Sequence, residues 1–567
     1  MSILIPISGL ILAIFAYWFY RYNSRDNKTR ILNDKQNIKD VGMYYLVLAR
    51  VKNKPVAISE HSRYMHTQVI GSTGTGKTRY VFYPSIYQDI RRGAGCFILD
   101  VKSNMLPTVG SFAQYFKRNQ DFYYFDIASQ WSLTYNPLIG DDPNEIASRI
   151  CTALYSDEER SEQFYKEIGE RFISSLVRLL HTFPVQITFE ELYYHITDMA
   201  KLRAKCIERP GNIDAEYFLA NWTELPDLAR QKQLIGLINK IGPFVTSKWS
   251  HLINTRNPDI VMDDIVANNK ILLFGLSSQQ YSNQYKPIAI LALMHLQSVI
   301  AKRYIQAEKQ GYFLYLDEFK DIVYSKFADL INKAREAKVG IMIGHQSLGD
   351  LSSISDSFEN IVLTNTRNKV ILSLDNVESA EYFSKLIGTH TIDEKVYSYA
   401  PEGIWNKVSG YSIKKVEEFI VHPNKFKNLK DGFAILRIKD DEGTSNFATT
   451  LHSISELPAF DPKSLKKPER QDNHNEFLAT TQKTANKSAE PAADSKVSNT
   501  IREEAPSTPS LQPEKNTIVI QQKRTMKNPL KKEPKYPKND KVNEAIKNFK
   551  RQELKSNLPK ENNAIQD

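Results

Sequence analysis

The chain alternates short apolar runs with longer segments of helical period. Apolar runs of four to six residues are typical of strands that are buried on both faces of a parallel sheet. We expect strands at residues 44–48, 55–58, 66–70, 96–100, 122–126, 270–274, 312–316, 339–344, 369–373 and 433–437. Their alternation with helical segments predicts an α/β fold with a largely parallel sheet.

The period changes in the middle of the chain. From residue 142 to about residue 255 the helical period dominates, and apolar residues recur every fourth position at Phe164, Ile168, Phe172 and Leu176. Residues 188–191 (Thr-Phe-Glu-Glu) form a capping box, which is a signature of a helix start. We therefore expect an all-α insertion at 141–262 that divides one core into two halves, at 22–140 and 263–458.

An apolar run at residues 3–20 is followed directly by basic residues. As a helix it would be about 27 Å long, close to the thickness of the hydrocarbon layer of a bilayer. No Lys or Arg precedes the run, whereas Arg21, Arg25, Lys28 and Arg30 follow it. A cleaved signal peptide would instead have basic residues before the run and a small-residue cleavage site after it. We expect a single-pass anchor at 1–21, with the N-terminus outside and the bulk of the chain in the cytoplasm.

The positive charge of the chain is concentrated near its end. The net charge of the 567 residues is +10, and residues 515–560 hold 14 Lys and Arg against 4 Asp and Glu. The segment 459–567 is rich in Lys, Asn, Ser and Pro and poor in aromatic residues, which predicts a disordered basic tail. Such a tail suits nucleic acid, anionic lipid or an acidic partner, or is simply solvated. The three cysteines lie far apart and indicate neither a disulfide framework nor a zinc site.

A glycine-rich motif follows the strand expected at 66–70. Its residues are Gly71, Ser72, Thr73, Gly74, Thr75, Gly76, Lys77 and Thr78, which match the pattern G-x-x-x-x-G-K-[ST]. In this motif backbone N–H groups cradle phosphate oxygens, the lysine reaches the β and γ phosphates, and the hydroxyl group is a ligand for Mg²⁺. We predict that these eight residues bind ATP and that an extended segment follows at 81–83.

A second motif supplies the acidic groups that hydrolysis of a nucleotide needs. The apolar run at 312–316 ends at Asp317 and Glu318. An acid at such a strand end holds Mg²⁺ directly or through water, and we assign this role to Asp317 together with Thr78. Glu318 is placed to polarise the attacking water as a general base. The alternative is a strand that merely ends in two solvated acids; the glycine-rich motif upstream favours the catalytic interpretation.

Together these motifs resemble the type IV secretion coupling proteins of the conjugative TraD/TraG kind. The resemblance covers about residues 44–452 and rests on the N-terminal anchor, GSTGTGKT, CFILDVK, the helical insertion, FLYLDEF and IMIGHQSLGDL. It implies a RecA-like P-loop ATPase core with an inserted all-α domain. It also implies that the protein assembles as a hexamer at the bacterial inner membrane and uses ATP and Mg²⁺.

The resemblance assigns further site residues. Asp100 and Lys102 match an Asp-x-Lys motif that lies beside the nucleotide in the family, and Gln346 occupies the strand end where a polar sensor would feel the γ-phosphate. Ring ATPases commonly supply an arginine finger from the neighbouring subunit, and Arg335 and Arg367 are both candidates. Each arginine could instead form a structural ion pair, and Gln346 could be a solvated loop residue.

The function that the resemblance implies is a motor that drives a relaxase-bound DNA strand, and sometimes protein substrates, towards a secretion channel. Expected partners are single- or double-stranded DNA without strong sequence preference, relaxosome proteins, channel components and the membrane. A DNA motor of the FtsK/HerA kind shares the core but not this insertion. The alternative from another class is a membrane-anchored docking scaffold or substrate receptor that binds nucleotide without pumping DNA. Many family members have two membrane helices around a periplasmic domain, whereas this sequence has one such run.

Overall fold

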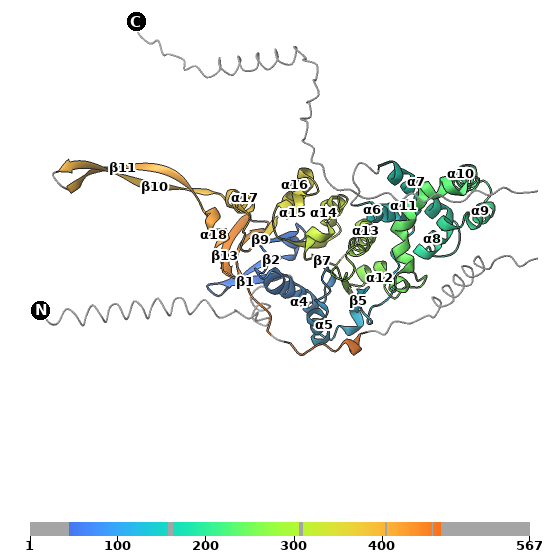
Figure 1. Ribbon diagram of the computed structural model, residues 1–567. Helices are drawn as coiled ribbons and strands as arrows, with labels where there is room; N and C mark the ends of the chain where they lie inside the picture. Colours follow the sequence, from blue (N-terminus) through green and yellow to red (C-terminus); the bar gives the residue numbers. More distant parts are fainter. Residues whose placement is uncertain (1–44, 157–162, 306–309, 403–404, 456, 466–567) are drawn as a thin grey trace, which may run out of the picture. The chain divides into compact units, whose positions relative to one another are not determined.

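The computed structural model describes residues 45–156, 163–305, 310–402, 405–455 and 457–465 (Figure 1). The anchor predicted at 1–21 and all of the predicted tail after residue 465 lie outside the described residues. Within them the chain forms a nine-stranded sheet in the order β13-β12-β9-β3-β8-β7-β4-β6-β5, and two separate two-stranded sheets. The expected α/β fold with a large, mainly parallel sheet is therefore confirmed.

The strands of the large sheet coincide with the apolar runs of the sequence, except for β13, which was not predicted. They are β3 (Thr67–Ile70), β4 (Gly95–Asp100), β5 (Phe122–Asp126), β6 (Ile271–Gly275), β7 (Tyr312–Leu316), β8 (Val339–His345), β9 (Asn368–Ile371), β12 (Phe433–Lys439) and β13 (Thr444–Thr450). The seven strands from β9 to β5 are parallel, and β12 and β13 add an antiparallel pair at one edge. The loops that follow β3, β4, β7, β8 and β9 consequently meet at one edge of the sheet.

Helices cover both faces of this sheet (Figure 1). Within β7, Phe313 and Tyr315 belong to the core on one face, and Leu314 and Leu316 belong to the core on the other. On the first face lie α4 (Tyr83–Arg91) and α5 (Leu106–Tyr115). On the second face lie α6 (Pro143–Leu154), α12 (Met262–Ala267), α13 (Tyr285–Lys302), α14 (Phe327–Ala334) and α16 (Asp356–Asn365). This burial on both faces explains why the strands read as continuous apolar runs.

Among the described residues, one segment is long and apolar enough to cross a membrane by length and composition, namely Tyr285–Ile305. It contains α13 and the short 3-10 turn η5 (Arg303–Ile305). Its side chains Leu291, Leu293 and Leu296 are at most 1 % exposed, and α13 packs against α6. The segment is therefore a core helix, and its burial explains why it is apolar on nearly all sides.

Six helices follow one another within the segment where the sequence predicts the insertion. They are α6, α7 (Gln163–His181), α8 (Phe189–Thr197), α9 (Met199–Ile207), α10 (Ile213–Asn221) and α11 (Asp227–Thr246). The hydroxyl group of Thr188 accepts a hydrogen bond from the Glu191 N–H at 3.2 Å, as the capping box predicts. In α7, Phe172 and Leu176 are fully buried, whereas Phe164 is exposed near the start of the helix.

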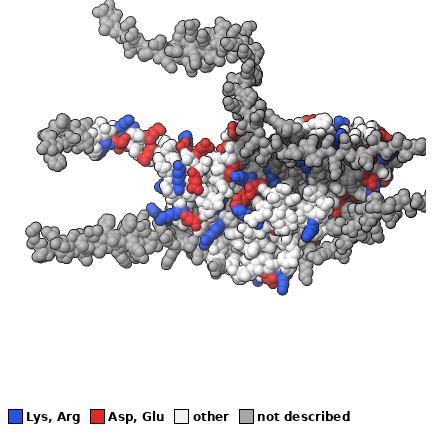
Figure 2. Space-filling view, viewed as in Figure 1, with Lys and Arg blue, Asp and Glu red and all other residues white. Residues whose placement is uncertain are grey.

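Besides β13, a long hairpin was not predicted from the sequence. The strands β10 (Thr389–Glu402) and β11 (Trp405–Phe419) pair only with each other and form a long hairpin (Figure 1). Tyr397, Tyr411 and Ile413 are more than half or about half exposed, so the described part of the hairpin has no core of its own. Figure 2 shows Lys and Arg mixed with Asp and Glu along it. Because charged residues interrupt its apolar residues along the chain, the segment does not read as a continuous apolar run like the strands of the large sheet.

The remaining described elements connect these parts. They are β1 (Tyr45–Val51), β2 (Lys54–Ser59), α3 (Glu60–Arg63), α15 (Gly349–Ser352), α17 (Val377–Ile387), α18 (Pro423–Lys427), and the short turns η2 (Asn119–Asp121), η4 (Ser250–Leu252), η6 (Phe319–Ile322) and η7 (Pro462–Ser464). The strands β1 and β2 coincide with the runs expected at 44–48 and 55–58, and they form an antiparallel pair with positive φ at Lys52 and Asn53 in the turn between them.

The expectation of an extended segment at 81–83 is wrong. Residues Thr78–Phe82 form one turn of π-helix, η1, which continues directly into α4. The β-branched and aromatic composition of this stretch favours a strand locally. Val81 and Phe82 are nevertheless fully buried against the sheet as part of a helix, so tertiary packing overrides the local preference.

Candidate active site

The glycine-rich motif forms a loop between the end of β3 and the start of η1. Gly74 and Gly76 have φ angles of +82° and +84°, which side chains with a Cβ rarely adopt. A Cβ on Gly76 would lie 2.4 Å from the ring of Tyr80, so this position also requires glycine for space. The loop is tied to the segment that follows β9, because the Ser72 N–H donates to the Ser373 carbonyl at 2.8 Å. The loop that we predict to cradle phosphate therefore depends structurally on its glycines.

Lys77 is buried beneath this loop. Its Nζ donates to the carbonyl oxygens of Gly71 at 2.6 Å and of Ser72 at 3.3 Å. Burial lowers the pKa of Lys77, and the negative charges of Asp317 and Glu318 oppose that shift. The ammonium group is thus held inside the loop, close to the two acids of the second motif.

The two motifs meet although they are 239 residues apart. The hydroxyl group of Thr78 donates a short hydrogen bond to Oδ2 of Asp317. Asp317 Oδ1 accepts the N–H of Glu318 at 3.0 Å, and burial raises the pKa of Asp317 while the Thr78 hydroxyl opposes the rise. A hydroxyl and a carboxylate oxygen are hard donors of the kind that Mg²⁺ binds together with phosphate oxygens. The donor set therefore fits Mg²⁺ with a nucleotide.

No cluster of three or more His, Cys, Asp or Glu side chains suited to a metal ion occurs in the described ranges.

Glu318 lies directly after Asp317 in an unusual backbone conformation. Its φ angle is +54° and its ψ angle is +45°, in the left-handed region, and the turn η6 begins at the next residue. Oε1 of Glu318 is 2.5 Å from Lys102 Nζ, and Oε2 accepts from Gln346 Nε2 at 3.5 Å. A non-glycine residue in this region is strained, and such strain is concentrated at functional sites.

Gln346 connects the general-base candidate with the phosphate loop. Its Oε1 accepts from the Thr73 hydroxyl at 3.0 Å, while its Nε2 reaches Glu318. The structure thus brings Thr73, Gln346, Glu318 and Lys102 into one chain of polar contacts at the carboxyl edge of the sheet. The role of Gln346 as a sensor of the γ-phosphate stays a prediction.

Asp100 lies below these groups, at the end of β4. It is 2 % exposed, and its Oδ2 accepts the N–H of Met105 at 2.6 Å. Burial raises the pKa of Asp100 to about 6, although the hydrogen bond from Met105 opposes the rise. Asp100 shapes the turn that carries Lys102, and Lys102 contacts Glu318 rather than the glycine-rich loop.

Two further residues order the turn that carries Gln346, and neither was predicted from the sequence. The buried carboxylate of Asp350 accepts the N–H groups of Gln346 at 2.8 Å and of Ser347 at 3.1 Å through Oδ2. His345 has one ring nitrogen 2.8 Å from the Ser347 carbonyl oxygen and the other 2.7 Å from Gln68 Nε2. An Asp four residues after a strand-end polar residue is the signal that could have indicated such a cap.

The two candidate arginine fingers lie far from the phosphate loop of their own chain. Arg335 precedes β8 and Arg367 precedes β9, so both are at the amino-terminal edge of the parallel strands. Both side chains are exposed, and the N–H of Arg367 donates to the Met65 carbonyl at 2.9 Å. The structure does not bring either arginine to Lys77 of the same chain.

A buried ion-pair cluster joins the helix after the phosphate loop to the strand that carries Asp317. Arg63 donates to both carboxylate oxygens of Asp89, at 2.6 and 2.7 Å, and Arg92 contacts the same carboxylate at 2.8 Å. The Tyr315 hydroxyl donates to Asp89 Oδ2 at 2.5 Å. Because Asp89 is on α4 and Tyr315 is on β7, the cluster fixes the relative position of Thr78 and Asp317.

Comparison with known proteins gives a consistent result. A family model described as "TraM recognition site of TraD and TraG" matches residues 312–431. The structure of the bacterial conjugative coupling protein TrwB is similar, with 16 % sequence identity and a TM-score of 0.56, over 77 % of this chain and 95 % of TrwB. The resemblance to the TraD/TraG coupling proteins is confirmed.

TrwB has also been solved with nucleotides. The complex of this coupling protein with ADP and Mg²⁺ matches at 16 % identity and a TM-score of 0.55, and the complex with a non-hydrolysable GTP analogue at 17 % and 0.55. Each match covers 77 % of this chain and 96 % of TrwB. No curated protein matches the sequence. The matched coupling-protein segment contains Asp317, Glu318, Gln346 and the β10–β11 hairpin, whereas the glycine-rich loop lies before it.

Proposed function

We propose that this chain is a membrane-anchored, ATP-driven DNA translocase that couples relaxase-bound single-stranded DNA, and protein substrates, to a type IV secretion channel during conjugation. The observation that carries this proposal is the meeting of Thr78 with Asp317, with Glu318 and Gln346 beside them. A protein that only bound nucleotide would have no need of a strained, positioned glutamate at this place. The resemblance to conjugative coupling proteins in sequence and fold supports the choice of substrate and partner.

In this function each group has a defined task. Lys77 neutralises the β and γ phosphates, and Thr78 and Asp317 hold Mg²⁺. Bound Mg²⁺ and ATP supply a polarised γ-phosphoryl group. Glu318 accepts the proton of the attacking water, and Gln346 keeps Glu318 and the phosphate loop in register. The complexes of TrwB with ADP and Mg²⁺ and with a GTP analogue support nucleotide and Mg²⁺ as cofactors here.

A ring of six subunits completes the site. Arg335 or Arg367 supplies the trans finger to the phosphates bound by the neighbouring copy. Their exposure at the edge opposite the phosphate loop supports action on a neighbour rather than on the same chain. In such a ring DNA passes through the pore and is held by its phosphates, which predicts weak sequence preference and strong salt dependence.

The remaining partners follow from the expected topology. The apolar segment at 3–20 anchors the ring in the bacterial inner membrane, and the basic tail adds affinity for DNA or for an acidic partner. The family model for a TraM recognition site supports a relaxosome protein as a partner of the segment at 312–431.

The test is ATP hydrolysis by the purified full-length chain, with and without single-stranded DNA, beside two variants. Glu318→Gln keeps ATP binding and lowers kcat by about 10²–10⁴-fold, because the general base is lost. Lys77→Ala loses ATP binding. Stimulation of the wild type by DNA supports a translocase. Hydrolysis that DNA does not change favours a coupler of protein substrates, and unchanged kcat in Glu318→Gln refutes the assignment of the base.

A further inference from the structure

The carboxylate of Glu318 has two partners, which lie at unequal distances from it. Lys102 Nζ lies 2.5 Å from Oε1, whereas Gln346 Nε2 lies 3.5 Å from Oε2, at the limit of a hydrogen bond. The phosphate loop lies on the side of Gln346, because Gln346 also accepts a hydrogen bond from Thr73. Glu318 therefore lies closer to its partner after β4 than to its partner on the side of the phosphate loop.

We propose that Lys102 is a latch on the general base: its ion pair with Glu318 opens before Glu318 can accept a proton from water at the phosphate loop. The inference rests on the proposed ATPase function. It gives Lys102 a positioning role that differs from the nucleotide contact implied by the Asp-x-Lys motif.

The backbone that carries Lys102 is held by hydrogen bonds, whereas the Lys102 side chain is half exposed. The turn after β4 is held by Asp100, which accepts the Met105 N–H, and by Ser103, whose hydroxyl accepts the Ser277 N–H at 2.7 Å. The Lys102 side chain itself is 47 % exposed. The hydrogen bond to Glu318 raises the pKa of Lys102, so the ammonium group stays charged at neutral pH. A fixed backbone therefore presents a charged group that can leave Glu318 without any rearrangement of the sheet.

The ion pair is weak enough to open in every catalytic cycle. Pairs with this degree of exposure are worth little, because water screens them and two flexible side chains must be ordered. We therefore expect that removal of the latch changes kcat by about two- to fivefold, which is far less than the loss of the base itself.

Steady-state kinetics of the full-length chain test the proposal. Lys102→Met raises kcat two- to fivefold, and the Kd for a non-hydrolysable ATP analogue stays unchanged. Lys102→Arg, which can keep the ion pair, stays near the wild type. The matched control is Lys302→Met, because Lys302 is 46 % exposed and is paired with Asp141 and Asp263 away from the site. A lower kcat or a weaker analogue affinity in Lys102→Met overturns the latch.

A second measurement does not depend on turnover. Acetylation of individual lysines, followed by mass spectrometry, reports how freely each amine can react. The latch predicts that Lys102 is labelled faster in Glu318→Gln than in the wild type. It also predicts faster labelling in the wild type when Mg²⁺ and a non-hydrolysable ATP analogue are added. In Lys77→Ala the analogue should have no effect on labelling. Unchanged labelling in Glu318→Gln, or protection by the analogue, overturns the latch. If hydrolysis is absent altogether, the translocase proposal fails while the labelling still decides the latch.

Discussion

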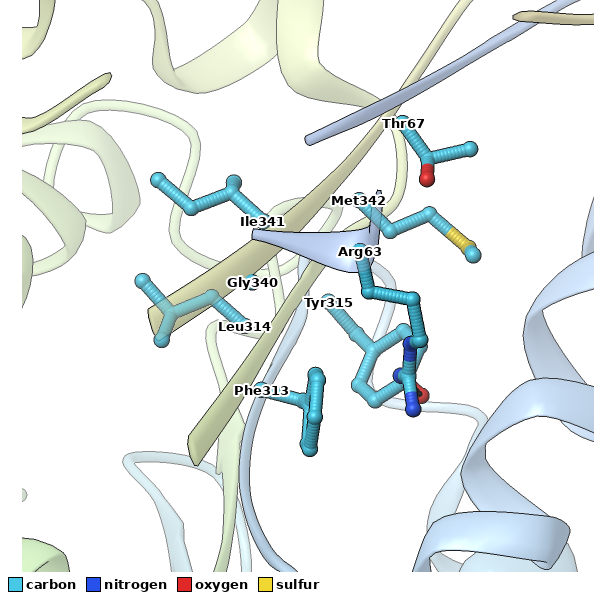
Figure 3. Close-up of a pocket in the computed structure, with 8 residues that line it drawn as sticks. All are labelled: Arg63, Thr67, Phe313, Leu314, Tyr315, Gly340, Ile341 and Met342. Atoms are coloured by element: carbon cyan, nitrogen blue, oxygen red, sulfur yellow. Dashed lines mark hydrogen bonds between the residues drawn. The ribbon is translucent and has the colours of Figure 1, made fainter. Parts of the chain in front are cut away.

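The buried cluster of Arg63 and Asp89 should contribute strongly to stability. Arg63 is 4 % exposed and Asp89 is fully buried, and Figure 3 shows the Arg63 guanidinium group beside the Tyr315 ring. Burial alone would raise the pKa of Asp89, but the charges of Arg63 and Arg92 outweigh it and lower the pKa. The guanidinium group also lies 3.6 Å from the centre of the Phe313 ring. The carboxylate is therefore the main partner of a charge that water cannot reach.

Asp89→Ala leaves the Arg63 charge buried without this carboxylate. Removal of one partner of a buried pair lowers the free energy of unfolding by about 3–5 kcal/mol. Urea unfolding of the full-length chain, followed by tryptophan fluorescence, measures this loss. The double variant Arg63→Met/Asp89→Ala should be more stable than Asp89→Ala alone, because the unpaired charge is then absent.

The matched control is Asp121→Ala. Asp121 also pairs with an arginine, Arg118, at 3.1 Å, but Asp121 is 44 % exposed, so the expected loss is below about 1 kcal/mol. A loss below about 1 kcal/mol in Asp89→Ala, or a double variant less stable than the single one, would refute the reasoning.

Two further predictions concern Lys369 and Gly76. Burial lowers the pKa of Lys369 to about 7, so the unfolded chain binds more protons than the folded chain between pH 7 and 10. The free energy of unfolding of the wild type should therefore rise by about 4 kcal/mol over this range relative to that of Lys369→Met. Urea unfolding measures both proteins, and the same pH dependence in both would contradict this prediction. Gly76→Ala should weaken ATP binding about tenfold or more, as measured by calorimetry, because the new Cβ would meet the Tyr80 ring. Gly93 has a similar φ of +83° but open space around it, so the control variant Gly93→Ala should leave ATP binding unchanged.

The sequence by itself determined the strands of the core and the chemistry of two motifs. The runs at 96–100, 122–126 and 312–316 became β4, β5 and β7, because a strand that is buried on both faces must be apolar throughout. The order of residues in Gly71–Thr78 indicated a phosphate loop for a similar reason: the backbone conformation that the loop needs is available only to certain residues. Such requirements are local and can be read from neighbouring residues.

Only the tertiary structure decided which distant groups meet. Lys102 contacts Glu318 because β4 pairs with β7, and Thr78 reaches Asp317 because only β8 lies between β3 and β7 in the sheet. Strand order depends on pairing between segments hundreds of residues apart, and no local pattern encodes it. The same reason explains the failure at 81–83, where burial against the sheet made a helix of a segment with strand-like composition. For the same reason the ion-pair cluster around Asp89 and the cap formed by Asp350 were not predicted from the sequence, because each joins groups from separate elements of the fold.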